Sequence, residues 1–546
     1  MTTRQRWTMV AVILGSAIVF LDSSVVNLAL PRIGEELPSS LFARLEAQSY
    51  VANGYFVTLS ALLVLAGALA DFYGRRRMYA IGLVGFGVTS LLCGLAPNME
   101  QLILFRILQG AAGALVVPAS LSIITASFDG EEQGWAFGIW AGSSAATSIL
   151  GPLVGGILVN SVSWRAAFFI NLPFLVLAYF ATMRQVPESR DEQASGRFDW
   201  LGSAVVAIAV GGLSFGTIRG QQAEWRGIEA FVSLAMGALA AAALPVLILR
   251  RKDPLVPPSL FRSRNFTVAN LATFVIYGAL YVSFTFQGLF LIGTIGYNEP
   301  AAGLAGLPAT LFIVVFSTRF GKLAARYGPR LFMALGPAVM GSGLLWLTRF
   351  PADSSPWIFG TGEGRSLIPP ADYFVDVFPG MVVFGMGLMM LVAPLTTAVM
   401  TSVPRHNAGV ASAINNAISR VGAPLVTALI FVAVVSTFYR AIQDRVPDVN
   451  TSTTEFRRTV APLNPPRGRA NPEIVSAAQE ASTESFHLAM IVASGLLWLG
   501  AVVNALGIKN PGRSAAAIEE AAARPAGGLE EVPVCCQGPT PARRKE

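Results

Sequence analysis

The sequence predicts an all-α integral membrane protein, and three observations point to this fold class. Hydrophobic residues make up 53% of the 546 residues and charged residues only 13%, which is too little charge to cover the surface of a soluble protein. Apolar runs of about 20 residues, enough to cross a hydrocarbon core roughly 30 Å thick, recur along the whole chain. Lysine and arginine gather in short clusters between these runs, as expected for the loops that orient a polytopic protein.

The order of these runs predicts about fourteen membrane spans. An even number places both termini on one side of the bilayer. The basic loops at 75–77, 250–252 and 319–330 fall on the side of the termini, which is therefore the cytoplasmic side. We expect a multi-pass protein of the cell membrane with both termini in the cytoplasm. The expected spans lie near residues 8–30, 47–70, 78–96, 101–125, 134–159, 164–184, 200–218, 229–249, 267–291, 300–320, 331–349, 374–399, 408–436 and 485–507.

Other classes of function fit the sequence poorly. The net charge of +7 lies in loops between apolar runs rather than along one face, so no nucleic-acid partner is expected. The three cysteines offer neither a disulfide framework nor the spacing of metal ligands. Gly321-Lys322 has no upstream glycine at phosphate-loop spacing. We therefore expect no enzyme activity and no cofactor, and active transport would use an ion gradient.

Two stretches of sequence occur twice. Residues 67–75 after the second span are echoed by 321–329 after the tenth, and 151–154 in the fifth span by 423–426 in the thirteenth. Two six-span halves that flank an inserted pair of spans account for both echoes. The expected domains are a six-helix bundle at 1–190, two inserted transmembrane helices at 191–255, a six-helix bundle at 256–509 with a long extracytoplasmic loop near 437–484, and a disordered cytoplasmic tail at 510–546.

Asp22 is the first candidate functional residue, because it lies inside the first span with apolar stretches on both sides. It is about 14 residues into that span, just outward of the bilayer centre. A carboxylate there costs at least ~2.5 kcal/mol, so it should face a cavity or a partner rather than lipid. Since burial favours the neutral acid, proton uptake near neutral pH is the functional interpretation. A hydrogen bond between helices is the structural alternative.

Two arginines lie at comparable depth. Arg106, in the fourth span, is close to the level of Asp22, and a change in their separation would drive proton release. Snorkelling toward the outer surface is the alternative. Arg420 lies near the middle of the thirteenth span beside Asn415 and Asn416, where polar groups either bind substrate or join helices.

Small residues cluster in the fourth and fifth spans and permit close approach of helix backbones. Pro152 removes a helical hydrogen bond and allows a bend. These residues form either a packing surface or a hinge or sliding seam. In the fifth span they are Gly142, Gly151, Gly155 and Gly156, with Pro152 among them.

In these segments the chain resembles the major facilitator superfamily, specifically its fourteen-span drug:proton antiporter branch, the relatives of multidrug and quaternary-ammonium exporters. Four motifs occur in the order of the family, and the resemblance covers residues 8 to about 507. The motifs are Leu21 to Pro31 in the first span, Gly67 to Arg76 in the cytoplasmic loop, Arg106 to Gly110 in the fourth span and Gly151 to Gly156 in the fifth. Trp164, Arg165, Asn171 and Pro173 also match the branch.

The resemblance implies alternating access between the two six-helix bundles. Asp22 would exchange protons and bind a cationic substrate, with Arg106, Gln109 and Arg420 as further candidates for coupling. A cytoplasmic gate is implied at the loop motif, and the alternative there is a capping carboxylate followed by an orientation signal. The gate residues are Gly67, Asp71, Gly74, Arg75 and Arg76.

We therefore expect a proton-coupled secondary active exporter of small lipophilic drugs or metabolites, neutral or cationic, working in the lipid bilayer. We expect a monomer. Binding of an envelope adaptor protein to the 437–484 loop is left as an alternative. One alternative is export of an endogenous lipid, siderophore or antibiotic. Another is a non-transporting sensor or scaffold, which has little reason to hold Asp22 at its depth. The aromatic candidates for a substrate cavity are Tyr50, Tyr55, Trp140, Tyr277, Tyr281, Phe284 and Phe286.

Overall fold

The structure, a computed structural model, is built from α-helices. Apart from one isolated bridge between Ala461 and Asn464, its described residues contain no β-structure, which confirms the all-α prediction. The structure describes residues 1–42, 44–190, 198–222, 225, 227–251, 254–362, 364–466 and 471–510, without the side chains of residues 44, 45, 148–150, 152, 153, 156, 157, 160, 161, 222, 454, 455 and 458. The tail predicted to be disordered, 510–546, lies outside this part except for Asn510.

Thirteen helices in the described part are long and apolar enough to cross a membrane. A further long helix, α5, stands at the place of the fifth expected span, so the helices fit the predicted fourteen. The long helices are α1 (Thr3–Glu36), α2 (Arg44–Tyr73), α3 (Arg75–Gly94), α4 (Met99–Ser127), α5 (Gly130–Ser161), α7 (Asn171–Gln185), α8 (Trp200–Gln222), α9 (Ile228–Arg250), α11 (Arg264–Leu289), α13 (Leu307–Tyr327), α14 (Arg330–Trp346), α16 (Phe378–Thr401), α17 (Ala408–Arg445) and α19 (Pro472–Gly507).

Short helices connect or extend the long ones. A π-helical segment, Phe290–Ile295, continues α11, and 3₁₀ turns follow α14 at Leu347–Arg349 and precede α17 at Arg405–Asn407. The short α-helices are α6 (Ala166–Phe169), α10 (Ser259–Arg262), α12 (Glu299–Ala305), α15 (Ala371–Asp376) and α18 (Thr454–Thr459).

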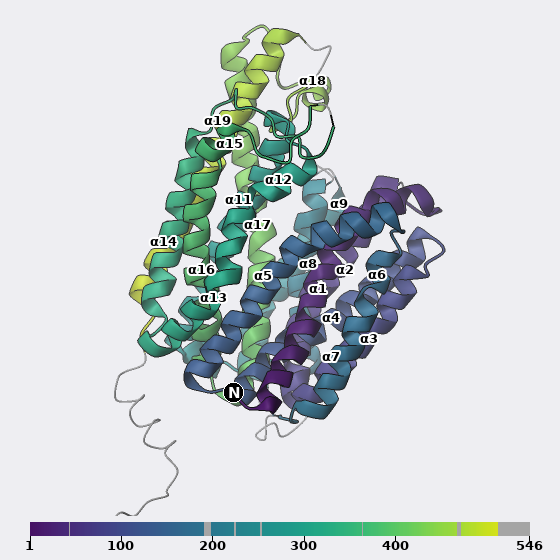
Figure 1. The fold of residues 1–546 in the computed structure, drawn as a ribbon, viewed down its shortest axis with the longest axis vertical. Helices are drawn as coiled ribbons and strands as arrows, with labels where there is room; N and C mark the ends of the chain where they lie inside the picture. Colours follow the sequence, from purple (N-terminus) through teal and green to yellow (C-terminus); the bar gives the residue numbers. More distant parts are fainter. Residues whose placement is uncertain are drawn as a thin grey trace, which may run out of the picture. The chain divides into compact units, whose positions relative to one another are not determined.

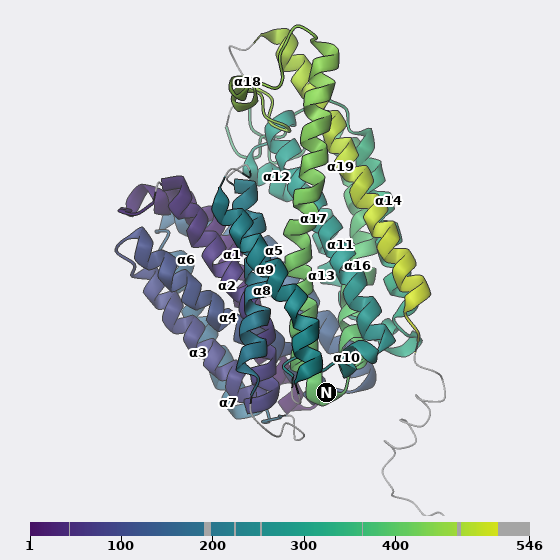
Figure 2. The same cartoon turned by 180° about the vertical axis from the view of Figure 1, so that it is seen from behind.

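The first seven helices pack on one another, and so do α11 to α19 (Figure 1). In the first group α1 contacts α5, α7 and α4, and α4 also contacts α2 and α3; in the second, α11, α17 and α19 pack together beside α13, α14 and α16. The groups meet where α5 packs on α13 and α2 on α17. Helices α8 and α9 form a pair, seen in front in Figure 2, and α8 contacts α2 and α17.

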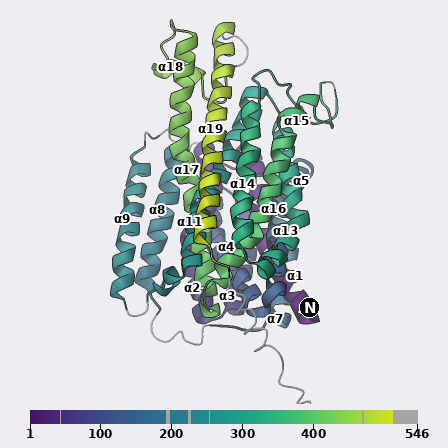
Figure 3. The ribbon, with the colours of Figure 1, turned by 90° about the vertical axis from the view of Figure 1, so that its left-hand side faces the viewer.

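Two helices are longer than the sequence patterns predict. The stretch 437–484, expected as a loop, is helical over much of its described length, because α17 continues to Arg445 and α19 begins at Pro472. These extensions stand beyond the neighbouring helices in Figure 3. Phe438 and Ile442 of α17 pack with Ala478 of α19 in a separate apolar cluster. Arg445 also pairs with Glu480 at 2.9 Å, so the two extensions stabilise each other.

Candidate functional site

Asp22 is fully buried in the middle of α1. Its carboxylate accepts hydrogen bonds from three side chains. Arg106 Nη1 of α4 forms an ion pair with Asp22 Oδ2. Gln109 Nε2, one turn further along α4, donates to Asp22 Oδ1 at 3.0 Å, and Asn171 Nδ2 of α7 donates to the same oxygen at 3.0 Å. Three helices therefore converge on one carboxylate, which we call the Asp22 cluster (Asp22, Arg106, Gln109 and Asn171).

Arg106 is held from several sides and is only 1% exposed. Its Nη1 also donates to Gln109 Oε1 at 2.8 Å, and its Nε donates to the carbonyl oxygen of Val51 at 3.3 Å. The guanidinium carbon lies 4.2 Å from the centre of the Tyr55 ring, a cation–π geometry. The Tyr55 hydroxyl in turn donates to the carbonyl oxygen of Val19 at 3.1 Å. Arg106 therefore turns inward rather than snorkelling to the surface.

Asn171 was noted in the sequence only as part of a motif. Besides Asp22, its Nδ2 reaches Ser90 Oγ at 2.9 Å, and Ser90 donates to the carbonyl oxygen of Phe168 at 2.9 Å. Its own Oδ1 is buried without a hydrogen-bond partner in the described part. An uncharged residue at a helix start carries little sequence signal, so only the geometry assigns Asn171 to the cluster.

The contacts of Asp22 are those of an ionised carboxylate. All three partners donate to its oxygens, and one of them is a cation. Removing one member of a buried ion pair leaves an uncompensated charge, which costs several kcal/mol. Asp22 and Arg106 therefore stabilise each other as long as their helices keep this spacing.

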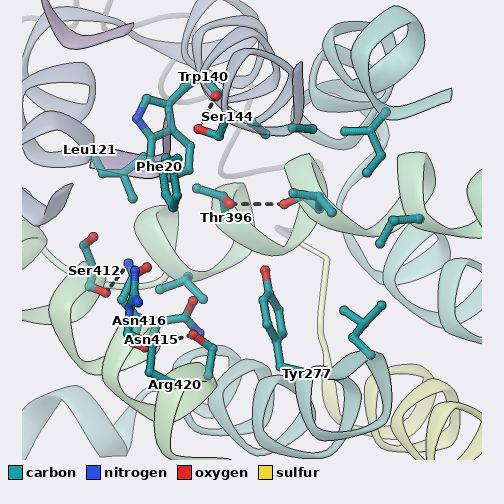
Figure 4. A pocket seen from close by; sticks show the side chains of 18 of the residues that line it. Phe20, Leu121, Trp140, Ser144, Tyr277, Thr396, Ser412, Asn415, Asn416 and Arg420 are labelled. Carbon is teal, nitrogen blue, oxygen red and sulfur yellow. Dashed lines mark hydrogen bonds between the residues drawn. The ribbon is translucent and has the colours of Figure 1, made fainter. Parts of the chain in front are cut away.

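A cavity of about 320 Å³ lies between the two groups of helices (Figure 4). Asp22 does not line it, although Phe20, two residues earlier, does. Among the lining side chains that the structure describes, only Arg420 is charged. The wall is formed by Phe20, Leu121, Trp140, Ala141, Ser144, Ala145, Tyr277, Leu280, Tyr281, Phe284, Ile313, Leu388, Val392, Thr396, Val399, Met400, Ser412, Asn415, Asn416, Ser419 and Arg420.

Some of the aromatic candidates lie in this wall and others do not. Trp140, Tyr277, Tyr281 and Phe284 line the cavity. The other three, Tyr50, Tyr55 and Phe286, lie elsewhere: Tyr50 contacts Phe42, Tyr55 covers Arg106 and Phe286 contacts Phe431. The sequence alone does not show which side of a helix faces the cavity and which side faces another helix.

The loop motif after α2 contacts the start of α17. Asp71 Oδ1 accepts from Arg75 Nε at 3.0 Å and from Arg75 Nη2 at 2.9 Å, and Asp71 Oδ2 accepts from the backbone N–H of Val410 at 3.0 Å. Arg75 Nη2 also donates to the carbonyl oxygen of Arg405. Asp71 therefore caps α17 across the boundary between the two groups, where an anion is stabilised by free N–H groups.

Gly67 stands one turn before Asp71, and a Cβ at Gly67 would lie 2.4 Å from the carbonyl oxygen of Gly409. Only a residue without a side chain allows this approach of α2 and α17. The same holds for α5 and α13, where a Cβ at Gly134 would lie 2.4 Å from the carbonyl oxygen of Gly321.

The remaining motif residues pack within the first group of helices. Gly74 adopts a φ of 111° between α2 and α3, which a residue with a side chain rarely adopts. The backbone N–H of Arg76 donates to Glu188 Oε1 at 3.0 Å, and Arg76 Nε lies 3.8 Å from Glu188 Oε2. Glu188 thus caps α3 and holds the segment after α7.

The fifth-span motif faces α1. A Cβ at Gly151 would lie 2.4 Å from the Cβ of Ser24, and one at Gly155 would lie 3.1 Å from the Cα of Val25. Both glycines therefore set the distance between α5 and the stretch of α1 just after Asp22. Pro152 and Gly156 belong to α5, but their side-chain surroundings lie outside the described part.

No metal centre is formed within the described residues, where no three His, Cys, Asp or Glu side chains converge. The arrangement offers instead a buried ion pair beside a mostly apolar cavity.

Comparisons with known proteins place these features in context. Residues 12–427 match the family model of the Major Facilitator Superfamily. The chain is 30% identical over 511 residues to the multidrug resistance protein Stp of Mycobacterium tuberculosis, with 91% of each chain covered. It is 29% identical to the tetracenomycin C resistance and export protein of Streptomyces glaucescens, covering 83% of this chain and 80% of that protein.

The fold is similar to a solved structure. The crystal structure of the human organic anion transporter MFSD10 matches with a TM-score of 0.58 at 13% identity, and covers 92% of this chain and all of the other. At this identity the likeness concerns the fold alone.

Proposed function

The chain belongs to the Major Facilitator Superfamily, and from this premise we propose that it is a proton-coupled exporter of lipophilic drugs or metabolites. The family confirms the predicted resemblance and the fold class, and it makes the chain a non-enzymatic, multi-pass membrane transporter. Its relatives are named for multidrug and antibiotic resistance. Proton coupling, the role of Asp22, a location in the cell membrane and cytoplasmic termini belong to the proposal.

The observation that carries this proposal is the burial of the Asp22 cluster beside the cavity. A carboxylate at such depth is expensive and is typical of proton relays in membrane transporters. Its contacts favour the ionised form, so this arrangement represents the state after proton release. Separation of α1 from α4 would remove Arg106, and the carboxylate would then take up a proton in its apolar surroundings.

The proposed coupling uses movement of the two helix groups against each other. In the proposed cycle they alternate between contact at one end and contact at the other, and Asp22 changes protonation as they move. Exchange of one proton for one monovalent cation is electrically neutral and uses the pH gradient. Export of a neutral compound also uses the membrane potential, about 2.3 kcal/mol per charge per 100 mV.

The proposal is tested with purified full-length protein in liposomes that carry an imposed pH gradient and ethidium as the probe. We expect gradient-driven ethidium transport by the wild type, and transport by Asp22→Asn at the level of protein-free vesicles. Exchange of ethidium for ethidium without a gradient should persist in Asp22→Asn, because exchange needs the cavity and the helix movement but no proton. Asp353→Asn, a change at an exposed aspartate in a loop, is the matched control and should behave as the wild type.

Uphill transport that survives in Asp22→Asn would remove Asp22 from the mechanism. Loss of both exchange and gradient-driven transport would indicate a folding defect, and tryptophan fluorescence and size-exclusion profiles identify that case.

A second candidate function is export of a compound that the host itself makes. It is favoured by the relative named for both resistance to and export of tetracenomycin C. The same proton chemistry serves either substrate, so the liposome assay tests the proton coupling that both candidates share.

A further inference from the structure

Arg420 is the cation of the central cavity, and the part of the chain that the structure describes places no anion beside it. It lies about 18 Å along α17 from the helix start, is half-buried, and lines the cavity with Asn416 and Tyr277. Within the described residues, no carboxylate lies within ion-pair distance of its guanidinium, and no hydrogen bond engages it. A charged group at this depth is costly unless something compensates it.

The buried and half-buried acids of α1 and α2 are already paired, and Glu100 of α4 is bound by the backbone N–H groups of Ser40 and Leu41. Each buried or half-buried carboxylate on the described parts of α1 and α2 contacts an arginine of its own, and α11 and α16 contain no acidic residue. These pairs are Asp22 with Arg106, Asp71 with Arg75 and Glu46 with Arg219. The positive charge of Arg420 is therefore left for a molecule in the cavity.

Many polar groups of the wall are committed to the protein. Asn415 Nδ2 donates to Asn270 Oδ1 and to Thr273 Oγ1, at 3.1 and 2.9 Å. Trp140 Nε1 donates to Ser16 Oγ at 3.0 Å. The guanidinium, with its planar set of N–H donors, is thus the strongest donor that faces the cavity, and the hydroxyl of Tyr277 points into the same space (Figure 4).

We propose that this cavity, besides the cationic and neutral compounds of the proposed function, also binds lipophilic organic monoanions, whose carboxylate or sulfonate accepts hydrogen bonds from Arg420 while aromatic and aliphatic side chains enclose the rings. The substrate class rests on the proposed export function. It deepens that function, because an exporter that exchanges a proton inward for an anion outward moves two charges in each cycle. Its transport then depends on the membrane potential as well as on the pH gradient.

Two probes with the same ring system test the inference. Anilinonaphthalene sulfonate carries one negative charge, and phenylnaphthylamine is its neutral counterpart without the sulfonate. Binding of each to the full-length protein in lipid nanodiscs is measured by energy transfer from tryptophan, with empty nanodiscs subtracted. Arg420→Gln should weaken sulfonate binding roughly tenfold to a hundredfold, the range of a charge-assisted hydrogen bond, and leave the neutral probe within about twofold.

Arg420→Lys keeps the charge without the planar donor set, so its affinity for the sulfonate should fall between those of the wild type and Arg420→Gln. Arg440→Gln is the matched control: it removes an exposed arginine of the same helix, and both affinities should stay unchanged. Equal affinities of wild type and Arg420→Gln for the sulfonate, or an equal loss for both probes, would overturn the inference.

The outcomes separate this inference from the proposed function. If ethidium export is proton-coupled and the affinity for the sulfonate is unchanged in Arg420→Gln, the proposed function is retained and the anion site is rejected. Sulfonate binding that depends on Arg420, together with no gradient-driven transport of ethidium or either naphthalene probe, would retain the site and reject the function.

Discussion

A carboxylate surrounded by Arg106, Gln109 and Asn171 sets strong constraints on its neighbours. If Arg106 is removed while Asp22 stays ionised, the buried charge is uncompensated and costs about 3–5 kcal/mol. If both are removed, the site is polar but neutral. The two residues should therefore show strong coupling in a double-mutant cycle.

We predict that Arg106→Gln lowers the thermal unfolding midpoint in detergent markedly, whereas the double variant Asp22→Asn with Arg106→Gln recovers most of it. Both variants should lack gradient-driven transport, because neither retains the exchangeable pair. Arg445→Gln, which breaks a partly exposed pair, should shift the midpoint little, as surface ion pairs contribute about 0–1 kcal/mol. Additive destabilisation in the double variant would contradict a direct interaction between Asp22 and Arg106.

At the residue scale, the sequence shows which charged side chains lie inside apolar runs, while their roles stay predictions. Asp22, Arg106 and Arg420 could be selected from depth alone. Asn171 could not, because a neutral amide near a helix end is common, and the position of Tyr55 against Arg106 depends on how α2 packs on α4. The depth of a residue in its span also does not show its surroundings. Asp22 is fully buried away from the cavity, whereas Arg420 lines it.

At the scale of elements, the sequence shows which residues share a helix face but does not show which helix that face contacts. Gly67 and Asp71 are four residues apart on α2, so both face the same neighbour. The spacing was readable from the sequence, but its partner, the start of α17 at Gly409, was not, because it lies far along the chain. Likewise, the loop expected at 437–484 is partly helical, because α17 and α19 cover each other's apolar side chains.

We predict that Gly67→Val separates α2 from α17. The new side chain would meet the backbone of Gly409, and overpacking of this kind costs about 1–3 kcal/mol, where each 1.4 kcal/mol shifts a two-state population tenfold. Spin labels at Tyr73 and His406, in a background with the three native cysteines replaced by serine, should report a longer distance by electron paramagnetic resonance. Gly495→Val, at a glycine with open space around it, is the control and should leave the distance unchanged.

An unchanged distance distribution in Gly67→Val would mean that the helices absorb the side chain without separating. The Gly67 contact would then have no part in the proposed helix movement.

At the scale of the whole molecule, the two groups of helices touch near the end that holds the N-terminus. Met1 pairs there with Glu132 at the start of α5, and the close approaches of α2 to α17 and of α5 to α13 lie at the same end. The family resemblance predicted two bundles that rock against each other. The sequence alone could not say which end is in contact, since a single sequence encodes every state of the cycle.

The last prediction follows from this contact. If transport requires the two groups to separate at this end, a covalent link across it should stop transport in an otherwise intact protein. Glu131 of α5 and Arg326 of α13 lie 3.9 Å apart across the contact, and both are exposed, so cysteines at these positions can be joined by a short cleavable bismaleimide. We expect gradient-driven ethidium transport to be lost on linking and restored on cleavage.

The equivalent link between positions 445 and 480 joins α17 to α19 within one group and should leave transport intact. Full activity of the linked 131–326 protein would show that transport proceeds without separation at this end, and alternating access by the two groups would have to be abandoned.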